Sequence, residues 1–177
     1  MSGRSILAGV AGVALVWLTP AAHAASDGGK EFLNHAIQGD IAEIQLGKLA
    51  QTNASDSGVK DFGKTLVDDH TAAQQKAESV AQAKGITPPT EPPKDAQKEY
   101  DNLSKVSGRQ FDKEFVDYMV KDHKKDIKAF QTEAKRNRDG EVAQLAQNDL
   151  PDLQKHLSMA ESLQKGTGQT ANVSSER

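Results

Sequence analysis

The chain has 177 residues, no cysteine and a net charge of −3, with 22 basic residues set among 25 acidic ones. A chain without cysteine forms no disulfides, and any metal site in it must use histidine, carboxylate or methionine side chains. The basic residues are interleaved with acidic ones along the sequence, which argues against a nucleic-acid partner.

The first 24 residues have the pattern of a secretory signal peptide. Arg4 is their only charged residue, an apolar run covers Ile6–Leu18, and Ala22-His23-Ala24 offers a cleavage site of small residues. A spanning helix needs about 20 apolar residues, so a retained membrane anchor is the less favoured alternative. We therefore expect cleavage after residue 24 and a periplasmic or secreted protein, with association to the outer membrane left open. We expect the mature form not to span a membrane.

Four long stretches then place apolar residues at helical spacing. They cover Lys30–Asn53, Ser57–Lys84, Gly108–Arg136 and a segment that begins at Glu141. Pro151 lies inside the fourth stretch, where we expect a kink or a restart. The sequence after Gly166 is polar, and we expect residues 166–177 to form a disordered tail.

The connection between the second and third stretches is unusually long for a helical bundle. Gly85 ends the second helix, four prolines between Thr87 and Pro93 exclude helix there, and a short helix is expected over Asp95–Val106. An extended linker of this length can return the chain to the opposite end of the molecule, as the crossover of ferritin-like bundles does. No stretch alternates as a strand would, so residues 25–165 predict one all-α domain, a ferritin-like four-helix bundle with a long crossover.

One motif occurs twice in the chain, once in the second and once in the third helix. Phe62–His70 reads FGKTLVDDH and Phe115–His123 reads FVDYMVKDH, so each copy has a Phe, a Val three places before the His, and an Asp-His ending. At about 100° per residue, each His falls on the apolar face of its helix. Both imidazoles are therefore expected to point into the core.

The other two helices each place one titratable residue on the same kind of face: Glu43 in the first and His156 in the fourth. Counted from the hairpin turns, Glu43 and His70 differ in height by about two residues, and His123 and His156 by about one. At a rise of about 1.5 Å per residue, each pair lies within roughly 3 Å of one level, near the middle of its helices. The four side chains are therefore expected to meet at the centre of the bundle.

Three histidines and a carboxylate form a ligand set that suits Zn²⁺, Cu²⁺ or Fe²⁺. A ligating histidine usually donates its second N–H to a carboxylate or a carbonyl oxygen. Four aspartates are placed for that outer role: Asp69, Asp122, Asp126 and Asp152. The alternative is a buried histidine–carboxylate network that holds no metal.

Several ordered motifs resemble a known family. They are Glu43–Ala50, Val59–Phe62, Val67–His70, Ser107–Asp112, Met119–His123 and Leu150–Leu157. Together they resemble the bacterial domain-of-unknown-function family 4142 over about residues 32–163. The resemblance implies an exported, ferritin-like helical protein, of a kind often labelled a membrane or outer-membrane protein. It implies no activity, because the function of that family is not established.

The sequence departs from the di-iron ferritins, which use a Glu-x-x-His motif on two helices. The residue three places before each core histidine is apolar here: Val67, Val120 or Leu153. Oxygen chemistry is therefore disfavoured, and an enzyme ranks last among the interpretations. We expect a non-enzymatic envelope or stress-related protein with a transition-metal site, or else a structural or protein-interaction module of the periplasm with no metal. The sequence identifies no protein partner.

Overall fold

The computed structural model of the protein describes residues 27–136 and 140–175, and in these residues it contains five helices and no strand. The helices are α1 (Asp27–Asn53), α2 (Ser57–Ala83), α3 (Lys94–Leu103), α4 (Gly108–Arg136) and α5 (Glu141–Ser175). The predicted all-α class is confirmed. The expected signal peptide lies outside the described residues.

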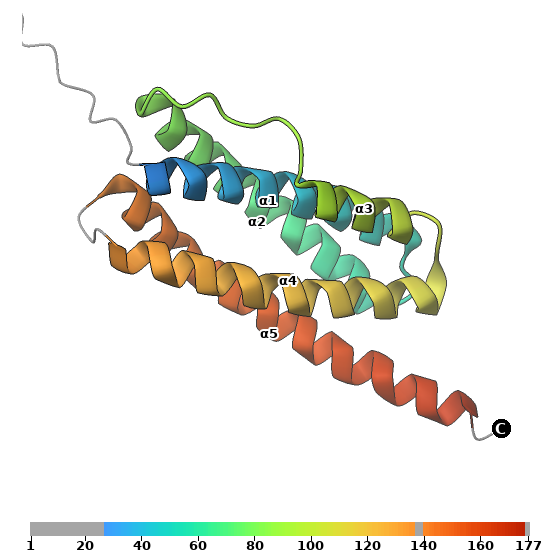
Figure 1. Ribbon diagram of the computed structural model, residues 1–177. Helices are drawn as coiled ribbons and strands as arrows, with labels where there is room; N and C mark the ends of the chain where they lie inside the picture. Colours follow the sequence, from blue (N-terminus) through green and yellow to red (C-terminus); the bar gives the residue numbers. More distant parts are fainter. Residues whose placement is uncertain (1–26, 137–139, 176–177) are drawn as a thin grey trace, which may run out of the picture.

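The four long helices form two hairpins, α1 with α2 and α4 with α5, and these pack against each other (Figure 1). The linker after α2 runs back along the molecule beside α1, and α3 rests on α1 and α4. Because the linker crosses to the far end of the molecule, α2 and α4 run in the same direction. The crossover thus allows all four long helices to share one interior.

Helix α5 is continuous over Glu141–Ser175. It is a single helix through Pro151, so the helix does not restart there. The Pro151 side chain is exposed on the outer face, where its ring meets solvent instead of a neighbouring helix. The α5 backbone also stays helical as far as Ser175, past Gly166, and its last turns extend beyond the other helices (Figure 1). A kink at Pro151 and the division into a domain of residues 25–165 with a tail stay predictions.

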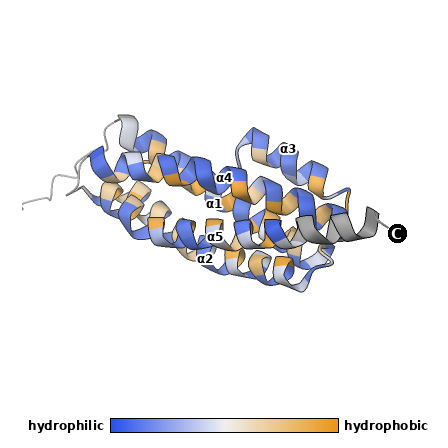
Figure 2. Ribbon diagram, turned by 90° about the horizontal axis from the view of Figure 1, so that it is seen from below, coloured by the Kyte–Doolittle hydropathy of each residue, from blue (hydrophilic) through white to orange (hydrophobic). Residues whose placement is uncertain are grey.

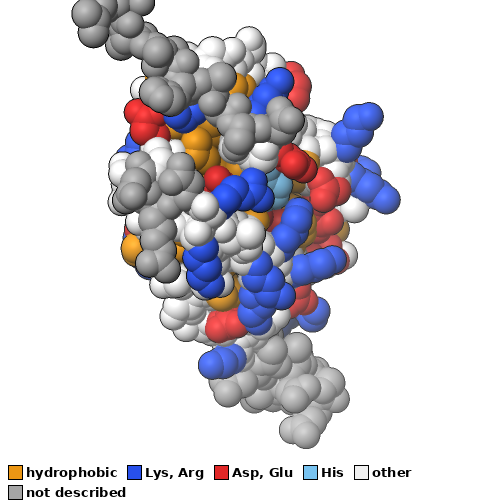
Figure 3. Space-filling model, turned by 60° about the vertical axis from the view of Figure 1, so that its left-hand side comes forward, with side chains coloured by type: hydrophobic (Ala, Val, Ile, Leu, Met, Phe, Trp, Pro, Cys, Tyr) orange, Lys and Arg blue, Asp and Glu red, His pale blue; other side chains and the backbone are white. Residues whose placement is uncertain are grey.

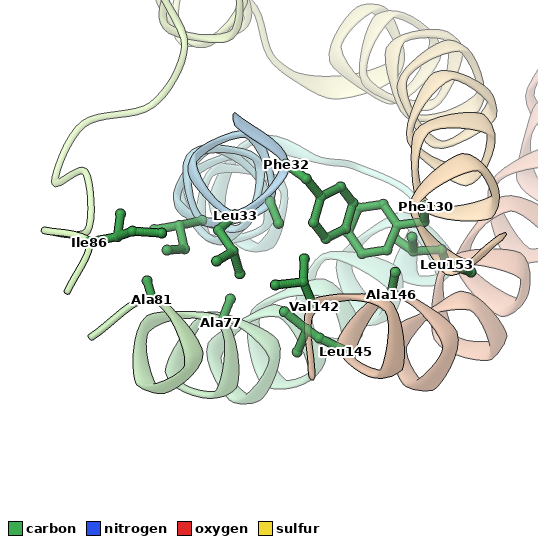
Figure 4. Close-up of a cluster of buried hydrophobic side chains, with 13 residues drawn as sticks. Phe32, Leu33, Ala77, Ala81, Ile86, Phe130, Val142, Leu145, Ala146 and Leu153 are labelled. Carbon is green, nitrogen blue, oxygen red and sulfur yellow. The ribbon is translucent and has the colours of Figure 1, made fainter. Parts of the chain in front are cut away.

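The apolar side chains form two clusters, one toward each end of the bundle. The first includes the edge-to-face pair Phe32 and Phe130, whose ring centroids lie 4.8 Å apart, with side chains from α1, α2, α4 and α5 around it (Figure 4). The second surrounds the rings of Phe62, Phe111 and Phe115. Hydrophobic residues turn toward the interior and hydrophilic ones outward (Figure 2). Between the two clusters lies a layer of buried polar side chains.

The outer surface carries charges of both signs. On the face drawn in Figure 3, acidic and basic side chains are interleaved and the hydrophobic areas between them are small. In the described part of the chain, no helix is both long and apolar enough to cross a membrane.

A buried carboxylate attaches the α1–α2 turn to α4. Asp112, which is only 2% exposed, accepts hydrogen bonds from the backbone N–H groups of Ser55 at 3.0 Å and Asp56 at 3.1 Å, and from the Ser55 hydroxyl. These bonds satisfy backbone donors at a point where the chain leaves one helix and has not yet entered the next. These bonds therefore fix the position of the α1–α2 turn relative to the N-terminal part of α4.

Gly47 on α1 and Gly63 on α2 let the two helices approach closely. Gly47 lies about one helical turn from Glu43, and Gly63 about two turns from His70. A Cβ atom on Gly47 would lie 2.6 Å from the Gly63 carbonyl oxygen, and one on Gly63 would lie 2.7 Å from the Gly47 carbonyl oxygen. Backbone oxygens cannot move aside as a flexible side chain can. The absence of side chains at these positions therefore fixes the distance between the two helices.

We expect Gly63→Ala to destabilise the protein by about 1–3 kcal/mol, because the new methyl group forces α1 and α2 apart. This loss exceeds the gain of about 1 kcal/mol that alanine normally brings to a helix interior. Gly39→Ala is the matched control, since a Cβ there meets only Asp126 Oδ2, at an ordinary 3.8 Å. The free energy of unfolding from urea titrations checks the pair. Equal stability of the Gly63→Ala and wild-type proteins would contradict the close crossing.

Candidate metal centre

The polar layer brings together one side chain from each long helix. Glu43 comes from α1, His70 from α2, His123 from α4 and His156 from α5, and their exposed fractions are 1%, 5%, 0% and 1%. The layer sits between the two apolar clusters, so these groups are shielded from water on both sides along the bundle axis.

The three imidazoles face one another closely. Their ring centroids are separated by 5.2 Å for His70 and His156, 5.4 Å for His123 and His156, and 6.1 Å for His70 and His123. One nitrogen from each ring lies within 4.8 Å of the corresponding atoms of the other two. Glu43 adjoins the same space, with Oε2 3.2 Å from His70 Nε2 and Oε1 3.4 Å from His123 Nδ1.

Each ring is oriented by one hydrogen bond to an oxygen outside this group. His70 Nδ1 donates to Asp40 Oδ1 at 2.8 Å, and His123 Nδ1 donates to the Met119 carbonyl at 3.0 Å. His156 Nε2 donates to Asp69 Oδ2 at 2.9 Å. Carboxylate and carbonyl oxygens accept, so a ring proton sits on each of these nitrogens, and in the neutral form of each ring the other nitrogen carries a lone pair.

Five acceptor atoms are left at the centre without a donor from the described residues: His70 Nε2, His123 Nε2, His156 Nδ1 and both oxygens of Glu43. A buried acceptor that lacks a donor costs about 1–3 kcal/mol, and a charged one costs more. These acceptors are satisfied when a cation or a hydrogen-bond donor lies among them. A metal ion, a proton and a water molecule can each serve.

The expected outer aspartates divide into three cases. Asp69 does hydrogen-bond a core histidine, His156. Asp122 and Asp126 instead gather beside Glu43, with one oxygen of each carboxylate within 4.8 Å of the others. Asp152 forms no hydrogen bond to any histidine in the described ranges, because His156 turns across to α2 and not back along its own helix.

Two partners were missed from the sequence. Asp40, 7% exposed, lies three residues before Glu43 on the same face of α1, and the same helical-wheel argument would have found it. The Met119 carbonyl leaves no mark in the sequence, because any residue four places before His123 presents one. Asp40 is thus a predictable member of the site, and the Met119 carbonyl is not.

A cavity of about 70 Å³ reaches the layer from one side. His70 and His156 form part of its lining, and four aspartates surround them: Asp40, Asp69, Asp149 and Asp152. Lys76 Nζ lies 4.0 Å from Asp149 Oδ1 on the cavity's edge. The lining is thus acidic around the two imidazoles, and its negative potential attracts cations.

The pKa values of the four buried groups shift in different directions. Burial works against the Glu43 charge, but His123, His70 and His156 outweigh it and lower the pKa of Glu43 to about 2. Burial likewise opposes the His70 imidazolium, yet Glu43 and the hydrogen bond to Asp40 raise the pKa of His70 well above its usual value. Burial lowers the pKa of His123 and of His156. Without a metal, His70 is therefore the histidine that holds a second proton.

The pKa values of the neighbouring Asp122 and Asp126 are raised. Burial, together with the nearby Glu43 charge, raises the pKa of Asp122 to about 7. Burial and the Asp122 charge raise the pKa of Asp126 to about 8. Three carboxylates that face one another without a cation repel, so protonation of the two aspartates is favoured in the folded protein.

The fold and the buried layer define a class: an all-α helical bundle with a histidine–carboxylate cluster at its centre. The family model described as "Domain of unknown function (DUF4142)" matches residues 18–163, and the chain belongs to that family. The resemblance seen in the sequence motifs is thereby confirmed. Neither a curated protein nor a solved structure matches the chain.

We expect Asp122→Asn/Asp126→Asn to become more stable relative to wild type as pH rises, when both are measured in chelator. The folded-state pKa values of these aspartates are raised to about 7 and 8, so the folded wild type binds more protons than the unfolded chain between pH 4 and 8. Wild-type stability therefore falls through that range, by an amount on the order of a few kcal/mol.

Urea titrations of both proteins from pH 4 to 9 check this. The histidines are present in both proteins, so their contributions cancel in the difference. A difference that stays constant or shrinks with rising pH would show that these carboxyl groups are not held in the protonated form.

Proposed function

We propose that this protein is an exported, ferritin-like four-helix bundle that binds a transition-metal ion in its interior in a non-enzymatic, envelope or stress-related role. The ligands are His70 Nε2, His123 Nε2, His156 Nδ1 and the Glu43 carboxylate. The observation that carries the proposal is the convergence of three buried imidazoles, one nitrogen of each within 4.8 Å of the others, with the buried Glu43 carboxylate beside His70 and His123. The signal-peptide pattern of the first 24 residues supports export, and the crossover between α2 and α4 supports the ferritin-like assignment.

The ligand set favours Zn²⁺ or Cu²⁺, with Fe²⁺ as the third candidate, because imidazole nitrogen suits all three. In a tetrahedral site with bonds of about 2.0–2.1 Å, ligand atoms are about 3.4 Å apart. One nitrogen of each of the three rings lies within 4.8 Å of the other two. Each ring therefore has to move by less than about 1 Å to close around an ion, and the outer hydrogen bonds already hold the rings in the required tautomers.

The space beside the cluster supports ion binding over turnover of an organic substrate. The adjoining cavity holds about 70 Å³. Pockets for small organic molecules usually hold about 300–1,000 Å³. Ions and water fit a space of this size, and larger substrates do not.

The second candidate is a metal-free structural or protein-interaction module whose buried network only stabilises the fold. The raised pKa of His70 favours it, since an imidazolium there compensates Glu43 and Asp40. One proton on His70 still leaves His123 Nε2 and His156 Nδ1 without a donor. The metal ion serves all four groups at once, which is why we prefer it.

We expect Zn²⁺ or Cu²⁺ to bind the purified protein with heat in calorimetry and to raise its melting temperature. An ion present at 100 times its Kd stabilises the folded state by about 2.7 kcal/mol, or roughly 5–10 °C for a chain of this size. The triple variant His70→Ala/His123→Ala/His156→Ala should lose both effects. His35→Ala, at a half-buried histidine outside the cluster, is the matched control. Glu43→Gln, nearly isosteric, provides the test if the triple variant does not fold.

The metal hypothesis fails if wild type shows neither heat nor a rise in melting temperature. A metal-free network would also lose stability with pH in the same way whether or not chelator is present. A bound ion instead makes that pH dependence differ with and without chelator, since ligands must be deprotonated before they bind metal.

We further expect zinc binding at pH 7 to release about one proton per ion. The pKa of His70 is raised well above its usual value, so the metal-free protein carries the imidazolium and must lose a proton before Nε2 can coordinate. Calorimetry in buffers of different ionisation enthalpy measures the number directly. Zinc binding without proton release would place His70 outside the ligand set.

A further inference from the structure

Three carboxylates meet on the side of Glu43 away from the cavity that His70 and His156 line. Asp122 and Asp126 are four residues apart on α4 and so share one helix face, and an oxygen of each lies within 4.8 Å of the other and of a Glu43 oxygen. Glu43 is 1% and Asp126 8% exposed, while Asp122 is half-buried. Like charges at such separations repel unless a cation lies among them.

Two basic side chains of the described residues line the space beside these carboxylates. His35 Nε2 lies 3.8 Å from Asp126 Oδ1, beyond hydrogen-bond distance. Lys125 lines the same space, but its side chain is exposed. From the histidine side, His70 Nε2 approaches Glu43 Oε2 at 3.2 Å, whereas no described residue donates a hydrogen bond to Glu43 Oε1. One oxygen of this fully buried carboxylate is therefore left without a hydrogen-bond donor from the described residues, which points to a ligand beside it.

The structure leaves room beside these carboxylates. A cavity of about 20 Å³ lies between α1, α4 and the start of α3, lined by Gly39, Tyr118, Asp122 and Asp126 among others. It is large enough for about one water-sized occupant. It shares no lining residue with the cavity beside His70 and His156. Glu43 lines neither cavity, but it adjoins His70 from the first lining and Asp122 and Asp126 from the second.

We propose that Glu43, Asp122 and Asp126 form a second cation site that takes a hard divalent ion such as Mn²⁺. Carboxylate oxygens and water are the ligands such ions prefer, whereas the histidine site suits borderline metals. With both sites filled, the Glu43 carboxylate bridges two ions, which in such centres lie about 3.5–4 Å apart. The inference rests on the proposed function only in that Glu43 belongs to both sites.

The experiment adds Mn²⁺ to the purified protein, before and after it is loaded with one equivalent of Zn²⁺. Free Mn²⁺ is followed by electron paramagnetic resonance, and bound zinc by metal analysis. Wild type should bind one further equivalent of Mn²⁺ after zinc loading. Asp122→Asn/Asp126→Asn should bind Mn²⁺ at least tenfold more weakly and keep its zinc, which also shows that it folds. Glu43→Gln should weaken both metals.

The exposed pair Asp68→Asn/Asp101→Asn is the control, because it removes the same charge outside the site. Mn²⁺ binding that is absent in wild type, or equal in wild type and Asp122→Asn/Asp126→Asn, overturns the second site whatever zinc does. Mn²⁺ binding that depends on the two aspartates in a protein that binds no zinc would support the second site and refute the proposed function. The two ideas therefore fail separately.

Discussion

The burial of one carboxylate among three imidazoles is the constraint on which the rest of this structure depends. Glu43 and its histidine neighbours lie between two apolar clusters, where an uncompensated charge would cost several kcal/mol. Each ring is held by an outer oxygen, and α1 and α2 are held close by two glycines. These features set the positions of the inner acceptors, where the Glu43 charge is balanced by the His70 imidazolium when no metal is bound.

Much of this could be predicted from the sequence, because the helices are long and their apolar faces regular. A count of residues from the hairpin turns placed Glu43, His70, His123 and His156 at one level, since helical rise converts sequence distance into depth. The prediction was less successful where contacts depend on which way a side chain turns. Asp152 shares a helix face with His156, yet His156 donates across the bundle to Asp69. The role of Glu43, His70, His123 and His156 as metal ligands stays a prediction.

Helix α1 organises the site more than the repeated histidine motif suggests. Within two turns it supplies Asp40, which orients His70, then Glu43, which adjoins both groups of candidate ligands. Gly39 on the same helix adds no side chain beside Asp126, so the small oxygen-lined space stays open. The motif in α2 and α4 determines where His70 and His123 lie. The spacing on α1 places Glu43 beside both the histidines and the pair Asp122 and Asp126.

The ligands of the histidine site come in equal number from the two hairpins: Glu43 and His70 from α1 and α2, His123 and His156 from α4 and α5. An ion bound to all four would join the hairpins at mid-height, between the apolar clusters that already join them toward each end. Metal binding would then add directly to the free energy of unfolding, because separation of the hairpins destroys the site. A cysteine-free bundle would gain from such an ion a cross-link at the level where its interior is least apolar.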